Sequence, residues 1–404
     1  MSNQVNPPRG MRDFLPGDKQ RREQVLAIIR QSYSAHGFQE IEAPALEDLG
    51  RLTSGQGGDN EKLVFRVLKR GEELDYAVAS GGELADLGLR YDLTVPLTRY
   101  FASNHSKLPK VFKSMQIGPV WRAERPQKGR YRQFLQCDID IIGDASLGAE
   151  AELLVASLDA LERLDLGDAK VRVNHRDLLI GAVTEWGVPQ EEQTSVLITL
   201  DKLDKIGHSG VEQELTERLG SQIAGRFTEW WKTRRTDQVP DKLQQLFTDV
   251  QSVFPNHLVF DPALVRGMGY YTGAIFEIQH PAVDGSIGGG GRYDGMVGRW
   301  LGMDTPAVGI SIGFERVIDL VALPKSDAPG VVIVHEPGEF AQALRVQREA
   351  IREGWRARLE TRSKRLNATL DQLAEFGFTH FLTIQGDSGF SGLETKPLTK
   401  LSPK

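Results

Sequence analysis

The first part of the chain shows helical and then strand-like spacing of its apolar residues. A helical pattern begins after Asp18, which we expect to cap the helix, and it stops at Gly37. Phe38 to Ala43 then fits a short strand that closes at Pro44, because proline lacks the backbone donor that a sheet interior requires. The helical stripe consists of Val25, Ile28, Ile29 and Tyr33, and a glycine-rich loop with Gly55, Gly57 and Gly58 follows the strand.

The segment from Arg132 to Ile142 has the clearest strand pattern. Apolar and polar residues alternate along it, so an extended backbone places the two sets on opposite faces. The polar face is typical of the floor of a polar site, and a solvated outer face is the alternative. The apolar set is Leu135, Cys137, Ile139 and Ile141, and the polar set is Arg132, Gln136, Asp138 and Asp140.

The central part of the chain is predicted to be helical between two stretches of strand. Leucines at helical spacing lead to a strand at Val171 and Val173, and residues 175–255 then show helical patterns only. Trp230 and Trp231 fit the core of this helical insertion better than a ligand platform. Strand spacing returns from Tyr270 to Ile278 and from Ala307 to Ile312. The leucines are Leu147, Leu154, Leu158 and Leu161.

A change in composition at residues 322–330, rich in Pro, Ser and Gly, predicts a linker. Strands and helices alternate beyond it, which indicates a small α/β domain. The expected elements are a strand at Val331–His335, a helix at Ala341–Ile351, a helix at Leu366–Phe376 and a strand at Phe378–Ile384. The predicted divisions are a core of residues 1–174 and 256–325, an insertion of 175–255 and a C-terminal domain of 326–404.

Composition narrows the class of protein. With 404 residues, 40% hydrophobic and 26% charged, the chain is long enough for two or three folded domains. A formal net charge of -6 means that a nucleic acid would have to be bound by a local basic patch. The single cysteine excludes an intrachain disulfide, and neither a signal peptide nor an apolar span of 18 residues is present, so we expect a cytoplasmic protein without a membrane partner.

Several common nucleotide and metal motifs are missing from the sequence. There is no P-loop, no GxGxxG and no HExxH, and the eight histidines show no paired metal-ligand spacing. These absences disfavour a P-loop enzyme, a dinucleotide enzyme and a zinc hydrolase.

Arginines on three distant segments are the strongest candidates for chemistry. The stretch Trp121–Arg132 has five cations against one carboxylate, Arg266 lies between apolar residues and glycines, and Arg316 opens a helix after a strand. Taken singly, they also fit a solvated loop, a structural ion pair and an exposed first-turn residue. Together they suit a polyphosphate, which needs several fixed cations. The run Gly288–Gly291 fits either a flexible turn or close approach to a ligand.

The same segments resemble the histidyl-tRNA synthetases, class II aminoacyl-tRNA ligases, over nearly the whole chain. Pro44 is similar to motif 1 of that class, Arg122–Phe134 to motif 2 and Gly313–Arg316 to motif 3. Two further matches belong to the histidine branch, namely Leu264–Gly267 with Tyr270 and Tyr271, and Gly288–Gly295. The resemblance implies an α+β fold with an antiparallel sheet core, a helical insertion and a small C-terminal domain that binds the anticodon.

The resemblance also implies roles for individual residues. Arg122 and Arg266 would contact the α-phosphate of ATP and the carboxylate of histidine, and Arg316 would hold the γ-phosphate. The other ATP contacts would be Glu124, Arg130 and Phe134, with Mg²⁺ on the phosphates and Glu315 as a contributor. The rest of the histidine site would be Asp92, Thr94, Gln136, Asp140, Tyr270, Tyr271 and Tyr293. Positions 92 and 140 carry Asp where many bacterial members have Glu, and Gly269 replaces a frequent Asp.

The implied activity is ATP-dependent histidine-tRNA ligation by a homodimer, with histidine and tRNA(His) as substrates. Two alternatives stay open. One is a non-catalytic, histidine-binding regulatory paralogue of ATP phosphoribosyltransferase, which would have no reason to keep the triphosphate arginines. The other is a sensor of uncharged tRNA. In the C-terminal domain a basic cluster fits either phosphate contacts or a solvated face, and its members are Arg356, Arg358, Arg362, Lys364 and Arg365.

Overall fold

The structure is a computed structural model, and it describes residues 5–54, 58–126, 129–266, 271–322, 329–386 and 388–398. By its internal contacts the chain divides into two compact units. The first comprises the described residues within 1–13 and 25–321, and the second those within 14–24 and 322–404. The segment 175–255 thus belongs to the first unit, and the three-part division expected from the sequence stays a prediction.

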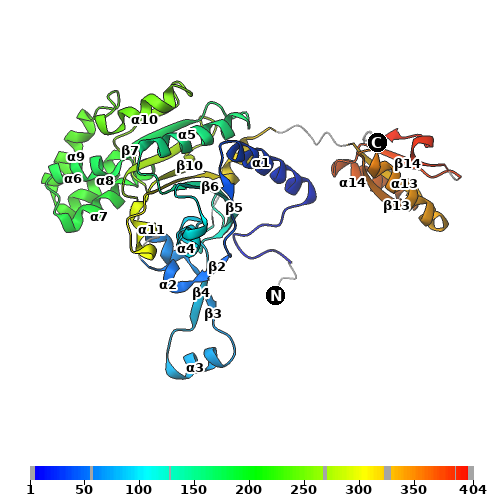
Figure 1. Cartoon of the computed structure of the whole chain (residues 1–404), viewed down its shortest axis with the longest axis horizontal. Helices are drawn as coiled ribbons and strands as arrows, with labels where there is room; N and C mark the ends of the chain where they lie inside the picture. Colours follow the sequence, from blue (N-terminus) through cyan, green and yellow to red (C-terminus); the bar gives the residue numbers. More distant parts are fainter. Residues whose placement is uncertain are drawn as a thin grey trace. The chain divides into compact units, whose positions relative to one another are not determined.

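The first unit is built on a mixed sheet that is mostly antiparallel (Figure 1). Only its two outer pairs are parallel among the described strands, β1 with β5 and β7 with β8. In spatial order the strands are β1 (Gln39–Glu40), β5 (Phe112–Trp121), β6 (Gln133–Ile142), β11 (Ala307–Gly313), β10 (Ser286–Arg292), β9 (Ala274–Gln279), β7 (Lys170–His175) and β8 (Leu258–Phe260).

The alternation predicted for Arg132–Ile142 is realised in β6. Cys137, Ile139 and Ile141 are fully or almost fully buried in the core, whereas Asp138 and Asp140 face the other side of the sheet. The run Gly288–Gly291, expected as a turn or a ligand approach, lies inside β10. It is therefore not a flexible turn.

Helices pack against this sheet. The first helix runs from Pro16 to Ala35, so Asp18 lies in its first turn and its prediction as the cap is wrong. Val25, Ile29 and Tyr33 on this helix are fully buried, as the stripe predicted. The helices of this part are α1 (Pro16–Ala35), α2 (Leu49–Leu52), α4 (Thr94–Asn104), α5 (Leu147–Glu162), α11 (Asp294–Leu301) and α12 (Phe314–Leu320), with 3-10 turns η1 (Gly58–Leu63) and η2 (His105–Lys107).

A small second sheet projects from the first unit with a helix at its tip (Figure 1). Its strands pair antiparallel in the order β2 (Leu46–Asp48), β4 (Ala85–Leu89) and β3 (Phe65–Leu68), and the tip helix is α3 (Glu72–Ser80). The apolar pattern did not predict this excursion, because several of its apolar side chains are exposed, including Leu68, Tyr76 and Val78.

The helical insertion lies between β7 and β8. It has its own core around Trp186 and Phe227, and Trp230 and Trp231 pack against that core, as predicted. Leu264 and Val265, which precede Arg266, are buried in the same cluster. Its helices are α6 (Arg176–Glu185), α7 (Gln190–Leu200), α8 (Leu203–Leu219), α9 (Ser221–Thr233) and α10 (Asp241–Gln251).

The second unit contains a four-stranded sheet in its described part, with helices on both faces. Three of its strands are parallel to one another, and the last pairs antiparallel. The strands in spatial order are β13 (Arg356–Thr361), β12 (Gly330–His335), β14 (His380–Thr383) and β15 (Lys396–Pro397), with α13 (Phe340–Arg352), α14 (Leu366–Glu375) and the 3-10 turns η3 (Pro337–Glu339) and η4 (Phe390–Gly392). This arrangement confirms a small α/β sheet and adds a strand, β13, that the sequence pattern did not predict.

The architecture is the α+β fold expected from the sequence. No helix in the described ranges has both the length and the apolar character that crossing a membrane requires.

Candidate active site

A single cavity of about 750 Å³ opens on the polar face of the central sheet and collects nearly all of the predicted site residues. Segments that are far apart in the sequence converge on it. Of the predicted residues, those that line the cavity are Asp92, Thr94, Arg122, Glu124, Arg130, Phe134, Gln136, Asp140, Arg266, Tyr271, Tyr293, Glu315 and Arg316. Tyr270 and Gly267–Gly269 lie outside the described residues.

The part of the cavity around Asp92, Gln136 and Asp140 presents buried acceptor atoms. Asp140 Oδ1 accepts a 2.6 Å hydrogen bond from the Tyr293 hydroxyl, and Asp92 Oδ1 accepts one of 3.1 Å from the Val95 backbone. Their second oxygens, and Gln136 Oε1, have no hydrogen-bond partner among the described residues. Because unpaired buried acceptors are costly, this part is suited to a ligand that brings donors, such as an ammonium group and an imidazole N–H.

Burial also shifts the acidity of these groups. It raises the pKa of Asp140 to about 7, against the hydrogen bond from Tyr293, which lowers it. It raises the pKa of Asp92 to about 6, against the backbone hydrogen bond of Val95 and the charge of Arg122. Groups with strongly raised pKa values that face one cavity are typical of functional sites.

Two glycines make room for the side chains of this site. Gly309 lies opposite Asp140 on β11, and a methyl group there would overlap with the Asp140 carboxylate. Gly289 lies on β10 under Arg266, and a Cβ atom there would be 2.6 Å from the Arg266 Cζ. Close approach is therefore the reason for glycine at these two positions.

The three arginines predicted from separate segments share the cavity. Arg122 donates from Nε to the Tyr91 carbonyl at 3.0 Å, and Arg266 donates from Nη1 to Glu277 Oε2 at 2.7 Å. Arg316 donates to the Ser286 carbonyl, and burial together with the nearby Arg130 and Arg266 lowers its pKa. The structural ion pair considered for Arg266 is thus present, yet the side chain still lines the cavity. Several cations held close together provide a strong anion site.

The other predicted ATP contacts already have partners within the protein. Glu124 faces Arg130 at 3.8 Å, and the Arg122 guanidinium lies 5.0 Å from the centre of the Phe134 ring. Glu315 accepts from Arg12 at 2.5 Å and from the Leu135 backbone at 3.2 Å. Arg132, which the alternation placed on the polar face, does not line the cavity and donates instead to the Glu124 carbonyl at 2.9 Å.

The cavity also contains residues that were not predicted as part of the site. Asp138 is buried on the polar face of β6, receives the Gln136 amide at 3.3 Å, and burial raises its pKa well above the usual range. The alternation along β6 had placed Asp138 on the polar face, although no role was assigned to it. Three residues of the insertion, Thr194, Ile198 and Asp201, line the cavity as well. Their spacing fits one face of a helix, but only tertiary structure brings α7 to the sheet.

Comparison with known proteins decides the family. A family model described as histidyl-tRNA synthetase matches residues 10–317. The chain is 49% identical to the histidine-tRNA ligase of Leifsonia xyli subsp. xyli, over 99% of this chain and 100% of that protein. The chain belongs to the histidyl-tRNA synthetase family. It is also 42% identical to the probable histidine-tRNA ligase of Tropheryma whipplei strain Twist, over 97% and 98% of the two chains.

The fold agrees with a solved structure of a histidyl-tRNA synthetase. The crystal structure of the enzyme from Nostoc sp. PCC 7120 superposes with a TM-score of 0.76 at 26% identity and covers 98% of this chain and 97% of that one. The chain is therefore a histidine-tRNA ligase of class II that uses ATP, with histidine and tRNA(His) as its substrates.

Proposed function

We propose that the cavity on the central sheet is where this synthetase joins histidine to ATP and then to tRNA(His). The observation that carries the proposal is the convergence of Arg122, Arg266 and Arg316 on the same cavity that holds the unpaired acceptors of Asp92 and Asp140. The cations suit a triphosphate, and the acceptors suit an amino acid with an ammonium group and an imidazole.

In this proposal the amino acid is bound by the buried acceptors and by the polar side chains next to them. Asp92, Thr94 and Gln136 bind its ammonium group, and Asp140 and Tyr271 bind the two imidazole nitrogens. Tyr293 orients Asp140 through the 2.6 Å hydrogen bond. An apolar amino acid would leave these buried groups unpaired, which can discriminate by a factor of about 10⁴.

The first chemical step is attack of the histidine carboxylate on the α-phosphorus of ATP. A new P–O bond forms, the bond to the β-phosphate oxygen breaks, and pyrophosphate leaves with that electron pair. Negative charge grows on the α-phosphoryl oxygens, so the fixed guanidinium groups of Arg122 and Arg266 stabilise the transition state more than the ground state. Arg316 and Arg130 hold the outer phosphates, and Glu124 and Phe134 hold the adenine.

In the second step a terminal ribose hydroxyl of tRNA(His) attacks the adenylate carbonyl. The ester bond forms as the hydroxyl releases its proton, the bond between the carbonyl carbon and the phosphate oxygen breaks, and AMP leaves with that electron pair. The same arginines remain next to the phosphate and stabilise AMP as the leaving group.

We also propose that Mg²⁺ accompanies ATP. The described residues contain no cluster of three potential ligands for a metal, so the protein alone does not form a cage for the ion. Mg²⁺ usually binds through one or two carboxylates and the substrate phosphates, and Glu315 at the cavity is the carboxylate that would contribute. When bound, the ion would neutralise charge on the phosphates.

Two further proposals concern the whole protein. We infer a homodimer from the motif 1 resemblance at Pro44, which is exposed in this single chain. Sedimentation at several concentrations tests it. We also propose that the synthetase acts in the cytoplasm, as expected from its lone cysteine.

The decisive experiment removes one guanidinium group. Arg266→Ala is expected to lower the rate of histidine-dependent ATP-pyrophosphate exchange about 10²- to 10³-fold, which is typical for loss of a preorganised donor. Near-normal exchange would contradict the role of Arg266. A wild-type protein without histidine-dependent exchange would instead point to the regulatory paralogue or to the tRNA sensor.

A further inference from the structure

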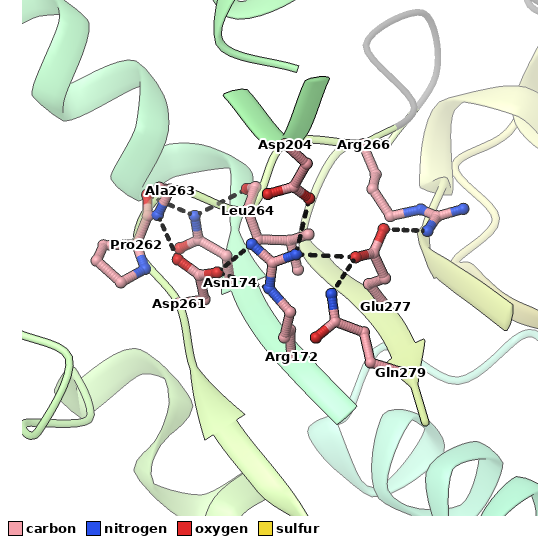
Figure 2. Close-up of polar contacts among 10 residues, drawn as sticks. All are labelled: Arg172, Asn174, Asp204, Asp261, Pro262, Ala263, Leu264, Arg266, Glu277 and Gln279. Carbon is pink, nitrogen blue, oxygen red and sulfur yellow. Dashed lines mark hydrogen bonds and ion pairs between the residues drawn. The ribbon is translucent and has the colours of Figure 1, made fainter. Parts of the chain in front are cut away.

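Arg172 on β7 is a charged residue that the catalytic proposal does not use, although it lies close to the cavity. Its guanidinium is mostly buried and contacts three carboxylates from three different elements. The Nε donates to Asp261 Oδ2 at 2.6 Å, and the Nη1 donates to Glu277 Oε1 at 2.9 Å and to Asp204 Oδ2 at 3.0 Å (Figure 2).

The sheet register explains why Arg172 and Arg266 meet at the same carboxylate. Arg172 on β7 is directly opposite Glu277 on β9, and Glu277 is directly opposite Gly289 on β10. Residues opposite each other in antiparallel strands share a face. Arg266 occupies the space above Gly289, so it meets Glu277 from one side while Arg172 meets it from the other.

Each oxygen of Glu277 therefore binds a different arginine. Oε2 accepts from Arg266 at 2.7 Å, and Oε1 accepts from Arg172 at 2.9 Å and from Gln279 at 3.1 Å (Figure 2). Because three donors fix the carboxylate on both sides, it presents one oxygen to Arg266 in a defined direction. Charge-assisted hydrogen bonds of this kind are stronger and more directional than neutral ones.

The same arginine also fixes the backbone that leads to Arg266. Asp261, bound to Arg172, accepts from the Ala263 backbone at 2.9 Å. Asn174, two residues along β7, donates to the carbonyls of Pro262 and Leu264 at 3.0 and 3.1 Å (Figure 2). Arg266 follows Leu264 by two residues, so the hydrogen bonds from β7 fix the position of the backbone just before Arg266.

The third carboxylate connects this network to the helical insertion. Asp204 belongs to α8, and its side chain is 69% exposed apart from the contact with Arg172. Leu264 and Val265 are buried in the hydrophobic core of the insertion. The insertion is therefore connected to the segment of Arg266 in two ways. Asp204 reaches it indirectly, through Arg172, and the apolar core of the insertion contacts Leu264 and Val265 directly.

We propose that Arg172 is a positioning residue for the Arg266 guanidinium, and that Asp204 makes this positioning depend on the helical insertion. The proposal rests on the catalytic role proposed for Arg266. Arg172 touches neither substrate; it acts by holding Glu277 and Asp261. Since displacement of a catalytic group by about 1 Å can cost roughly 10²-fold in rate, the network has a kinetic effect out of proportion to its contribution to stability.

The test is a double-mutant cycle measured as single-turnover adenylate formation with histidine and ATP. Arg172→Lys keeps the charge but loses the planar fork that contacts three carboxylates together. We expect it to lower the rate about 10- to 100-fold in the wild-type background and less than about twofold in the Arg266→Ala background, because residues that act as a unit are not additive. Equal losses in both backgrounds, or no loss in the wild type, would overturn the proposal.

Arg99→Lys is the matched control. Arg99 is a similarly buried arginine that pairs with Glu47 at 2.8 Å, and this contact involves no cavity residue. We expect its rate of adenylate formation to stay within about twofold of wild type. Melting temperatures of all variants separate a fall in rate from a fall in stability, and a control loss as large as that of Arg172→Lys would count against the proposal.

Asp204→Asn tests the link to the insertion and remains informative if Arg172→Lys does not fold. Its side chain is largely exposed, so the fold should tolerate the change. We expect a twofold to fivefold lower rate of adenylate formation, roughly the value of one exposed ion pair, and no further loss in the Arg266→Ala background. An unchanged rate would remove the insertion from the proposal. If Arg266→Ala itself keeps wild-type activity, the proposed catalytic role has failed, and the positioning role fails with it.

Discussion

At the scale of single residues, the site leaves part of the hydrogen-bonding capacity of its buried polar groups unused. Asp92, Gln136 and Asp140 each retain one acceptor atom without a partner among the described residues. A protein interior normally pairs such atoms, so their presence disfavours the empty form and favours the occupied one. The binding of histidine should therefore raise the melting temperature as well as fill the site.

The acidity of Asp92 gives a pH prediction. Burial raises its pKa to about 6, and only the ionised carboxylate pairs with the ammonium group of histidine. We expect kcat/KM for histidine to fall as the pH drops through about 6, since this parameter reports the free enzyme. For stability the sign is opposite: the raised pKa favours the empty fold at low pH, and this contribution is lost as the pH rises through about 6.

The measurement is a pH profile of pyrophosphate exchange for the wild type and Asp92→Asn. The imidazole of free histidine titrates in the same range for both, so the difference between the two profiles isolates Asp92. The variant should have a lower kcat/KM at pH 8 and no inflection of its own near 6. Parallel profiles would show that Asp92 does not contact the ammonium group.

The alternation along β6 indicated a polar floor with Gln136 and Asp140, and the sequence context of the three arginines indicated an anion site. The other predicted site residues followed from the family resemblance and not from their own pattern. Arg172 and Glu277 were not predicted, because each is an ordinary charge in a strand until the register places one opposite the other. Thr194 and Asp201 were missed for a similar reason, since the contact of α7 with the cavity is long-range.

At the scale of elements, β10 and β11 show how a sheet can carry a binding pocket. Their glycines at 289 and 309 leave room that the side chains of Arg266 and Asp140 occupy. The sequence left Gly288–Gly291 open between a flexible turn and close approach to a ligand, and Gly309 was not singled out because its neighbour Asp140 is more than 160 residues away in sequence.

Gly309→Ala tests this arrangement. A methyl group at position 309 would overlap with the Asp140 carboxylate, so either the carboxylate or the strand must move. We expect the KM for histidine to rise about tenfold or more, while the KM for ATP changes little, because overpacking costs about 1–3 kcal/mol. Steady-state exchange with each substrate varied in turn measures it. Equal increases for both substrates would indicate a general distortion of the sheet.

β13 is one of the strands of the second unit that the sequence pattern missed, together with β15. Its charged residues, Arg356, Arg358 and Glu360, alternate with Ala357 and Leu359, and the charges were read as a basic cluster rather than as one face of a strand. In the structure Arg356 donates to the Gly377 carbonyl at 2.6 Å, and Arg358 faces Glu360 at 3.3 Å. Part of the cluster is therefore structural.

At the scale of the whole molecule, the exposed cations of the second unit are candidates for binding tRNA(His). Arg362 pairs with Glu336 at 3.0 Å, whereas Lys364 and Arg365 are exposed beside it. Exposed cations on one short segment provide the local positive surface that a chain of net charge -6 needs for nucleic acid.

Reversing both charges, with Lys364→Glu and Arg365→Glu, should affect only the tRNA-dependent step. We expect a higher KM for tRNA(His) and a salt dependence of binding that is shallower by about two, one for each cation lost. Pyrophosphate exchange should be unchanged, because adenylate formation needs no tRNA. Aminoacylation at several salt concentrations checks this, and an unchanged KM would leave these residues as a solvated face.

The sole cysteine of the chain can serve as a chemical probe of the central sheet, on the face opposite the cavity. Cys137 is fully buried on the apolar face of β6, between Gln136 and Asp138, whose side chains line the cavity on the opposite face. A thiol reagent can reach its sulfur only when the strand separates from the layer below it. The rate of labelling therefore reports how often the sheet opens locally at β6. Slower labelling with histidine present would measure how much the bound amino acid stabilises the sheet against this opening.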